Sequence, residues 1–164
     1  MKTNKDKYSY LNSILNEAEQ LWKPGNKKKD YQKIINLYTE IIEIDSDFKD
    51  ALERRGVAYR QAKLYDQSIA DFMQCFSQRP GSPRFLRLAG EVQYLKHDYE
   101  SALLTLTRVL QIDSNDIYCT ETRAKVYRKL GMKEEAKADE KVVKEYYEAE
   151  QKKWDDPNHY YHYK

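Results

Sequence analysis

Two stretches of this chain follow the same pattern. Residues 56–72 read GVAYRQAKLYDQSIADF, and residues 90–106 read GEVQYLKHDYESALLTL. Each begins with glycine, continues to an aromatic residue, passes a polar break next to an Asp–Tyr pair and ends in an apolar run. The two stretches start thirty-four residues apart. A fixed period of this length is typical of chains built by repeating one small supersecondary unit.

At this period the chain divides into four units, at about residues 15–48, 49–82, 83–116 and 117–150. Two columns of the repeat are mostly small, which lets neighbouring helix backbones approach, and two are mostly large and apolar, which fills the space beside them. The small columns hold Trp22, Gly56, Gly90 and Ala124, then Ile34, Ser68, Ala102 and Ala136. The large columns hold Tyr38, Phe72, Leu106 and Glu140, then Ile41, Cys75, Val109 and Val143.

Each unit contains two helical patterns separated by a break. In the second unit, Ala51, Leu52 and Ala58 share one helix face, and a second apolar pattern begins at Ile69. The sequence QRPGS at residues 78–82 ends that second helix. The corresponding turns IDSD (residues 44–47) and IDSN (residues 112–115) contain residues that cap the following helix well. The sequence therefore predicts one helix hairpin per unit.

These columns resemble the tetratricopeptide repeat family. The match covers about residues 15–150, and the resemblance implies a right-handed superhelix of antiparallel helix hairpins, with the first helix of each pair lining a concave groove. The matching residues are Gly56, Tyr59, Ser68, Phe72, Cys75 and Pro80 in unit two, Gly90, Tyr99 and Ala102 in unit three, and Ala124, Tyr127, Gly131 and Ala136 in unit four.

Both ends depart from the repeat. In the first unit, Pro24 and Gly25 interrupt the first helix, which we expect to run from near Tyr8 to Lys23. In the last unit, polar residues replace apolar columns, as suits a terminal repeat that caps the array, and its last helix should run to about Asp155. We therefore expect a single repeat domain over residues 1–156 and an aromatic tail over residues 157–164. The polar replacements are Lys137, Glu140 and Lys144.

Composition limits the function classes. The net charge of +2, from 29 basic and 27 acidic residues, gives no general attraction to nucleic acids or membranes. Two cysteines cannot form a disulfide framework, and no apolar segment reaches the length of a spanning helix or signal core. We expect a cytoplasmic protein.

The sequence shows no catalytic constellation, and we expect no enzyme activity, cofactor or metal. His97 falls in a hairpin turn, and His159 with His162 lies beside Pro157 in the tail, which argues against a helical metal site. For Cys119, near a helix start, either a lowered pKa or simple packing explains the position. Phosphate loops and nucleophile turns are missing from the sequence.

The groove implied by the resemblance is the candidate binding site. Its stripe is more basic than the chain as a whole, and arginine forks bind carboxylates well, so the expected ligand is a peptide or partner surface that is acidic. The alternative is a hydrated groove in which Glu53, Glu91 and Glu121 pair with the neighbouring arginines. The candidate groove residues are Arg54, Arg60, Arg84, Arg87, Glu91, Tyr94, Tyr118, Lys125 and Arg128.

Other functions remain open at this stage. An adaptor that contacts RNA or phosphate would use Lys27–Lys29 together with the groove arginines, and a regulatory subunit of an enzyme complex is a third possibility. Relatives that clamp acidic chaperone tails carry Lys and Asn on the first groove helix. Here those columns hold Glu19 or Glu53 and Lys23 or Val57, so a clamp of this kind is disfavoured.

Overall fold

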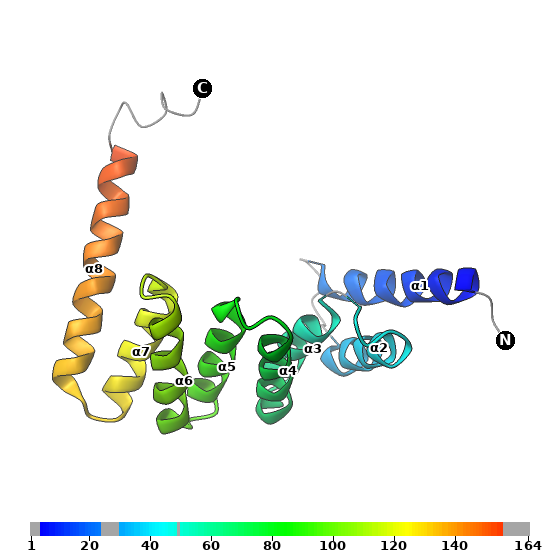
Figure 1. The fold of residues 1–164 in the computed structure, drawn as a ribbon, viewed down its shortest axis with the longest axis horizontal. Helices are drawn as coiled ribbons and strands as arrows, with labels where there is room; N and C mark the ends of the chain where they lie inside the picture. Colours follow the sequence, from blue (N-terminus) through cyan, green and yellow to red (C-terminus); the bar gives the residue numbers. More distant parts are fainter. Residues whose placement is uncertain (1–3, 24–29, 49, 156–164) are drawn as a thin grey trace. The chain divides into compact units, whose positions relative to one another are not determined.

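The computed structural model describes residues 4–23, 30–48 and 50–155. Within these ranges the chain forms eight helices and no strand (Figure 1). The predicted all-α fold of helix hairpins is therefore confirmed. The helices are α1 (Asn4–Trp22), α2 (Tyr31–Ile44), α3 (Ala51–Gln61), α4 (Tyr65–Gln78), α5 (Pro83–Leu95), α6 (Tyr99–Ile112), α7 (Ile117–Lys129) and α8 (Lys133–Asp155).

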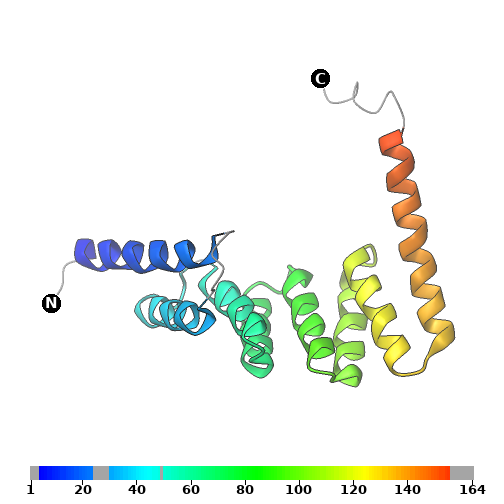
Figure 2. The same ribbon diagram turned by 180° about the vertical axis from the view of Figure 1, so that it is seen from behind.

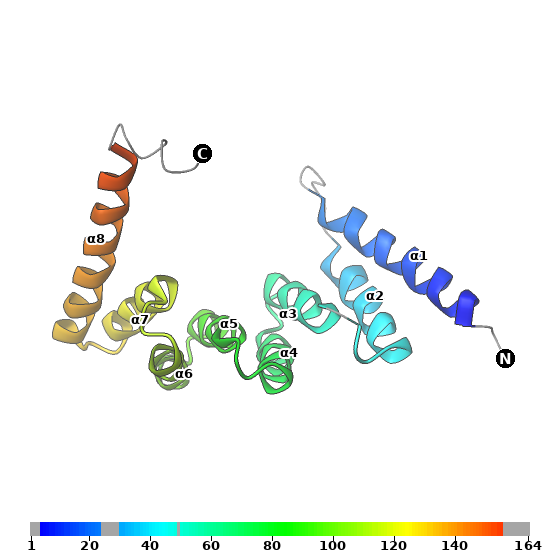
Figure 3. The ribbon, with the colours of Figure 1, turned by 45° about the horizontal axis from the view of Figure 1, so that its top comes forward.

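The helices belong to two compact units, Met1–Val92 and Gln93–Lys164. In the first unit, α1 packs on α2, α2 on α3 and α3 on α4, and Figure 3 shows the α1–α2 and α3–α4 hairpins. In the second unit, α6 packs on α7 and α7 on α8, which Figure 2 shows from behind. Each hairpin buries the apolar face of one helix against the other.

The turn inside the hairpins repeats at the same period as the sequence. Lys63, His97 and Gly131 stand thirty-four residues apart, and all three have positive φ, between 61° and 77°. After the first of these turns, the Leu64 N–H donates to the Tyr59 carbonyl and the Lys63 N–H to the Arg60 carbonyl, and the other two turns repeat this pair of bonds. This is the left-handed helix cap that glycine favours. His97 therefore has a structural place in a turn.

Aspartates cap several helices, but these aspartates lie outside the IDSD and IDSN turns to which the sequence pointed. The Asp116 carboxylate accepts from the Cys119 N–H at 2.9 Å at the start of α7, whereas Asp50 precedes α3 with φ 67° and makes no side-chain cap bond. The prediction that IDSD and IDSN supply the caps is wrong. The carboxylates of Asp45 and Asp113 instead accept hydrogen bonds from the backbone N–H groups of Asp47 and Asn115. These bonds stabilise the turn that precedes the next helix.

The columns of the repeat form the core. Tyr38, Phe72 and Leu106 are fully buried, and so are Ile41, Cys75 and Val109 in the neighbouring column. Only the last unit departs, because Glu140 and Val143 remain partly exposed there. The polar residue in this column of the last unit is therefore not part of the buried core. The residues of this comparison are Tyr38, Phe72, Leu106 and Glu140, with Ile41, Cys75, Val109 and Val143.

Of the two terminal helices, α1 starts earlier than the sequence predicts, and α8 ends where it predicts. Helix α1 begins at Asn4 rather than near Tyr8 and ends at Trp22, while Pro24 and Gly25 lie outside the described residues. Helix α8 continues to Asp155, as predicted, and runs well past the end of α7 (Figure 1). In the described part of the chain, every helix is too short or too polar to cross a membrane.

Candidate peptide-binding surfaces

The candidate groove residues are divided between the two units. Helices α3 and α5 carry Arg54, Arg60, Arg84, Arg87 and Glu91 in the first unit, and α7 carries Tyr118, Lys125 and Arg128 in the second. Tyr94 also belongs to the second unit, where its ring lies 5.8 Å from that of Tyr99.

Ion pairs join α3 to α5. Arg84 donates to the Glu53 carboxylate at 2.5 Å, and the Arg60 and Glu91 charges are 3.7 Å apart. Arg87 also donates to Glu91 at 2.5 Å, along α5 itself. Three of the four candidate arginines in this unit are therefore held by carboxylates of the same chain, and Glu53 and Glu91 pair as the hydrated-groove alternative expects.

Arg54 differs from the other arginines of this surface. Its side chain is exposed, and within the described residues no ion pair involves it. Burial raises the pKa of Tyr38, and the nearby positive charge of Arg54 opposes that rise. The guanidinium therefore lies close to a buried phenol and remains accessible to a carboxylate from outside.

A hollow of about 350 Å³ opens beside Arg54. Trp22 and Val57 give it an apolar wall, and its two acidic lining residues already have arginine partners, Arg79 for Asp50 at 3.6 Å and Arg84 for Glu53. The surface thus combines apolar area with an arginine that pairs with no carboxylate in the described part of the chain. It is lined by Trp22, Asp50, Glu53, Arg54 and Val57, and we call it the Arg54 hollow.

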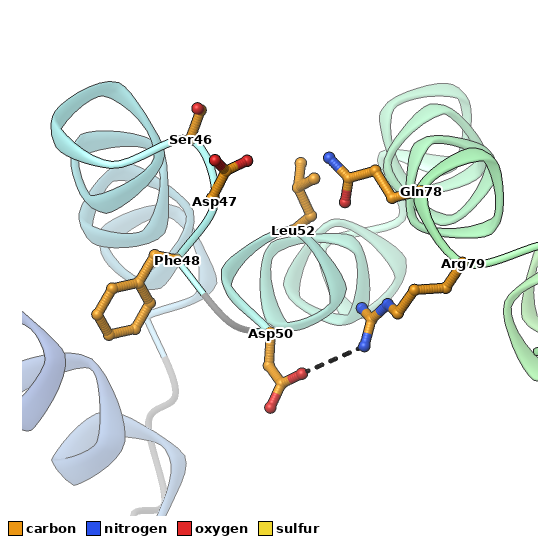
Figure 4. A pocket seen from close by; sticks show the side chains of 7 residues that line it. All are labelled: Ser46, Asp47, Phe48, Asp50, Leu52, Gln78 and Arg79. Carbon is orange, nitrogen blue, oxygen red and sulfur yellow. Dashed lines mark ion pairs between the residues drawn. The ribbon is translucent and has the colours of Figure 1, made fainter.

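A second hollow of the first unit lies at the loop edge, between the α2–α3 connection and the end of α4 (Figure 4). Its volume is about 400 Å³, and the Arg79–Asp50 ion pair crosses one side of it. The Arg79 guanidinium also lies 4.4 Å from the centre of the Phe85 ring. Arg79 therefore fastens the start of α5 to this edge, which gives the residue a structural role.

The surface of the second unit is built from α7 and α8. Lys125 pairs with Glu121 at 2.8 Å, and Arg128 pairs with Glu140 of α8. A smaller hollow of about 230 Å³ lies between these two pairs, with Ala124 and Val143 among its lining residues. Tyr118, at the start of α7, is 60% exposed.

Sequence reasoning missed a repeated ion pair inside the hairpins. Arg55 on α3 donates two bonds of 2.8 Å to Asp71 on α4, and Arg123 on α7 does the same to Asp139 on α8. Both aspartates are buried. The two pairs stand two repeat periods apart, so aligning the units at thirty-four residues places both arginines in one column and both aspartates in another. A search for apolar columns alone does not find this match.

The chemistry-bearing side chains elsewhere have structural explanations. Cys119 is fully buried and its Sγ donates to the Leu106 carbonyl at 3.3 Å, which favours packing over reactivity. Burial also raises the pKa of the Cys75 thiol. No cluster of three metal-ligating side chains occurs among the residues described, and His159, His162 and Lys27–Lys29 lie outside them.

Comparison with known proteins agrees with this architecture. A tetratricopeptide repeat model matches residues 50–82, which contain α3 and α4. This part of the chain is therefore a tetratricopeptide repeat. The small glutamine-rich tetratricopeptide repeat-containing protein 2 of Saccharomyces cerevisiae is 32% identical over 133 residues, which are 79% of this chain and 38% of that protein. The chain thus spans well under half of this relative.

Solved structures of similar fold are more distant in sequence. MamA from Desulfovibrio magneticus RS-1 is 14% identical with a TM-score of 0.69, over 90% of this chain and 77% of that chain. Another crystal structure of MamA has 17% identity and a TM-score of 0.69, over 90% and 88%. An O-GlcNAc transferase from Thermobaculum terrenum has 14% identity and a TM-score of 0.57, over 77% and 23%. At these identities the likeness shows the fold alone.

Proposed function

We propose that this chain is a non-enzymatic protein-interaction module, and that the Arg54 hollow receives a segment of its partner. The observation that carries the proposal is the guanidinium of Arg54 beside an apolar wall, which no carboxylate of the described residues pairs, on a surface where Arg60, Arg84 and Arg87 are already paired. An acidic side chain or terminal carboxylate would pair with Arg54 while an adjacent large apolar side chain covers Trp22 and Val57.

The ion pairs narrow the wider groove proposal. Arg84 and Arg87 hold α5 in place, and a reversal of Arg87 to Glu would set a second carboxylate beside Glu91 at a site where both side chains are largely buried. Such a variant would lose stability and binding together. The remaining candidates, Tyr94, Tyr118, Lys125 and Arg128, belong to the second unit and stay part of the proposed interaction surface.

The test selects ligands directly. A random peptide library displayed on phage is panned against the full chain, and recovered sequences should pair an acidic residue with a neighbouring aromatic or large aliphatic one. The variant Arg54→Glu should weaken a recovered peptide about ten-fold or more, because attraction becomes repulsion in a partly desolvated site. The same peptide with its acid changed to Lys should regain binding to the variant.

The control is Lys137→Glu on α8, which reverses an exposed charge that pairs with its neighbour Glu134. It should leave peptide affinity within about two-fold, since exposed surface pairs contribute little. Recovered peptides that bind Arg54→Glu as tightly as the unchanged chain would contradict the proposal and move the site to another face.

The second candidate is an adaptor that contacts RNA or phosphate through Lys27–Lys29. Its supporting observation is the basic run itself. Because phosphate contacts release counterions, such binding weakens steeply with added salt. The affinity falls by about ten-fold for each phosphate contacted when the salt concentration rises ten-fold. A shallow salt dependence for the natural partner, recovered by co-purification and mass spectrometry, would favour the peptide module. A regulatory subunit would instead co-purify with an enzyme.

A further inference from the structure

The open side of the α7–α8 hairpin repeats the positions that α3 uses to hold its next helix. Two repeat periods separate Glu53 from Glu121 and Arg60 from Arg128. On α3 the first pair of charges is satisfied by α5, since Glu53 binds Arg84 and Arg60 binds Glu91. On α7 the described residues satisfy the same two columns from within the hairpin, Glu121 by Lys125 and Arg128 by Glu140.

Burial follows the same division. Cys75 and Phe76 of α4 are buried, and the face of α5 that carries Phe85, Leu86 and Ala89 is buried as well. The residues equivalent to Cys75 and Phe76, two periods later, are Val143 and Lys144. Both line the hollow of about 230 Å³ between α7 and α8. A hollow thus lies in the second unit where the first unit has closed packing.

We propose that this hollow docks one α-helix of a partner protein, which carries a basic residue and, seven residues later, an acidic residue on either side of an apolar stripe. Seven residues are two helical turns, so the two charges share one face of that helix. The basic residue would meet Glu121 and the acidic residue Arg128, as Arg84 and Glu91 meet Glu53 and Arg60 in the first unit.

Charge complementarity disfavours a second copy of this chain as the occupant. The helix that a second copy would present is α1, the first helix of the array. At the columns of Arg84 and Glu91, this part of the chain has Asn16 on α1 and Lys23 directly after the end of α1. Asn16 adds no charge opposite Glu121, and Lys23 would repel Arg128. A partner helix with the opposite pattern fits the surface better.

The chain supplies its own probe. A synthetic peptide of residues 82–96, SPRFLRLAGEVQYLK, contains the charges and apolar stripe of α5. Binding of the labelled peptide to the full chain at low salt is followed by fluorescence anisotropy. We expect saturable binding, with chemical-shift changes of Ala124 and Val143 in a nuclear magnetic resonance titration.

Charge reversal identifies the contact. The peptide with Arg84→Glu should bind about ten-fold more weakly, and so should the unchanged peptide with the Glu121→Arg chain. The two reversals together should restore binding. A peptide that displaced α5 from α3 in the first unit would not respond to Glu121, so this restoration would place the peptide at α7. The matched control is Glu135→Arg, an exposed acid at the start of α8 outside these columns, and it should change the affinity by less than about two-fold.

Three results would overturn the proposal. One is the lack of saturable binding of the unchanged peptide at millimolar concentration, or of any restoration by the paired reversals. Another is a dimer of the full chain in sedimentation that Glu121→Arg dissociates, which would make a second copy the occupant. The last is a gain in peptide affinity of about ten-fold or more on removal of residues 156–164, which would assign the hollow to the chain's own tail.

Discussion

The hairpins α3–α4 and α7–α8 occupy equivalent places two repeat periods apart, and they differ in what fills the space between their helices. Both contain a buried Arg–Asp pair, and in both the arginine lies over a tyrosine ring, 5.7 Å away in one and 5.6 Å in the other. However, Gly56 and Phe72 of the first hairpin become Ala124 and Glu140 in the second.

The geometry explains why these two columns change together. A Cβ placed on Gly56 would lie 3.0 Å from the Phe72 ring, so a larger residue there would require the ring to shift by a few tenths of an ångström. Glu140 turns towards Arg128 instead, which leaves room for the methyl group of Ala124. The shared Arg–Asp pair thus holds each hairpin together. The residues in the columns of Gly56 and Phe72 vary with what packs against the hairpin from outside.

The largest difference should appear in the aromatic column. Phe72→Ala removes a fully buried ring and should lower the free energy of unfolding by about 3–5 kcal/mol. Glu140→Ala removes a partly exposed side chain and should change it by no more than about 0.5 kcal/mol. Urea unfolding followed by circular dichroism measures both free energies, and equal costs would show that the two hairpins do not differ at this column.

The shared ion pair should cost nearly the same in both hairpins. Asp71→Ala and Asp139→Ala each leave a largely buried arginine without its carboxylate, and each should lower the local stability by about 3 kcal/mol. Hydrogen exchange of amides in α4 and α8 reads the two losses separately. A loss well below 1 kcal/mol in either hairpin would mean that its arginine finds another partner or solvent.

The turns offer the smallest of the three contrasts. Lys63 closes α3–α4 with φ 61°, whereas Gly131 closes α7–α8 with φ 77°. Lys63→Gly should therefore stabilise the chain by about 0.5–1 kcal/mol, and Gly131→Ala should destabilise it by about 1 kcal/mol. Thermal unfolding of both variants checks the opposite signs, and a loss of stability in Lys63→Gly would contradict the turn assignment.

The sequence predicted the fold because the fold depends on columns that it displays. The period of thirty-four placed the helix hairpins, and the polar residues at 137, 140 and 144 indicated a unit whose repeat columns are not fully buried. The turn at His97 also fell where the pattern put it. The caps were misjudged, because whether Asp45 or Asp50 bonds to a backbone N–H depends on loop geometry that composition does not fix.

The binding surface was less accessible to sequence reasoning. Counting charges in the stripe treated Arg54, Arg84 and Arg87 alike. Only the structure shows that Arg84 reaches back to Glu53 across two helices while Arg54 has no carboxylate within the described residues. Long side chains choose partners by distance in space, and the thirty-one residues between Glu53 and Arg84 gave no local signal.

One variant tests most directly whether a neighbour, rather than the hairpin itself, decides what fills this column. The double change Ala124→Gly with Glu140→Phe gives α7–α8 the residues of α3–α4. If that column is open to solvent, the new ring is not covered, glycine costs about 1 kcal/mol of helix stability, and urea unfolding should show no gain in the free energy of unfolding. A gain of about 2 kcal/mol or more would show that the hairpin buries the ring unaided, and would contradict the account.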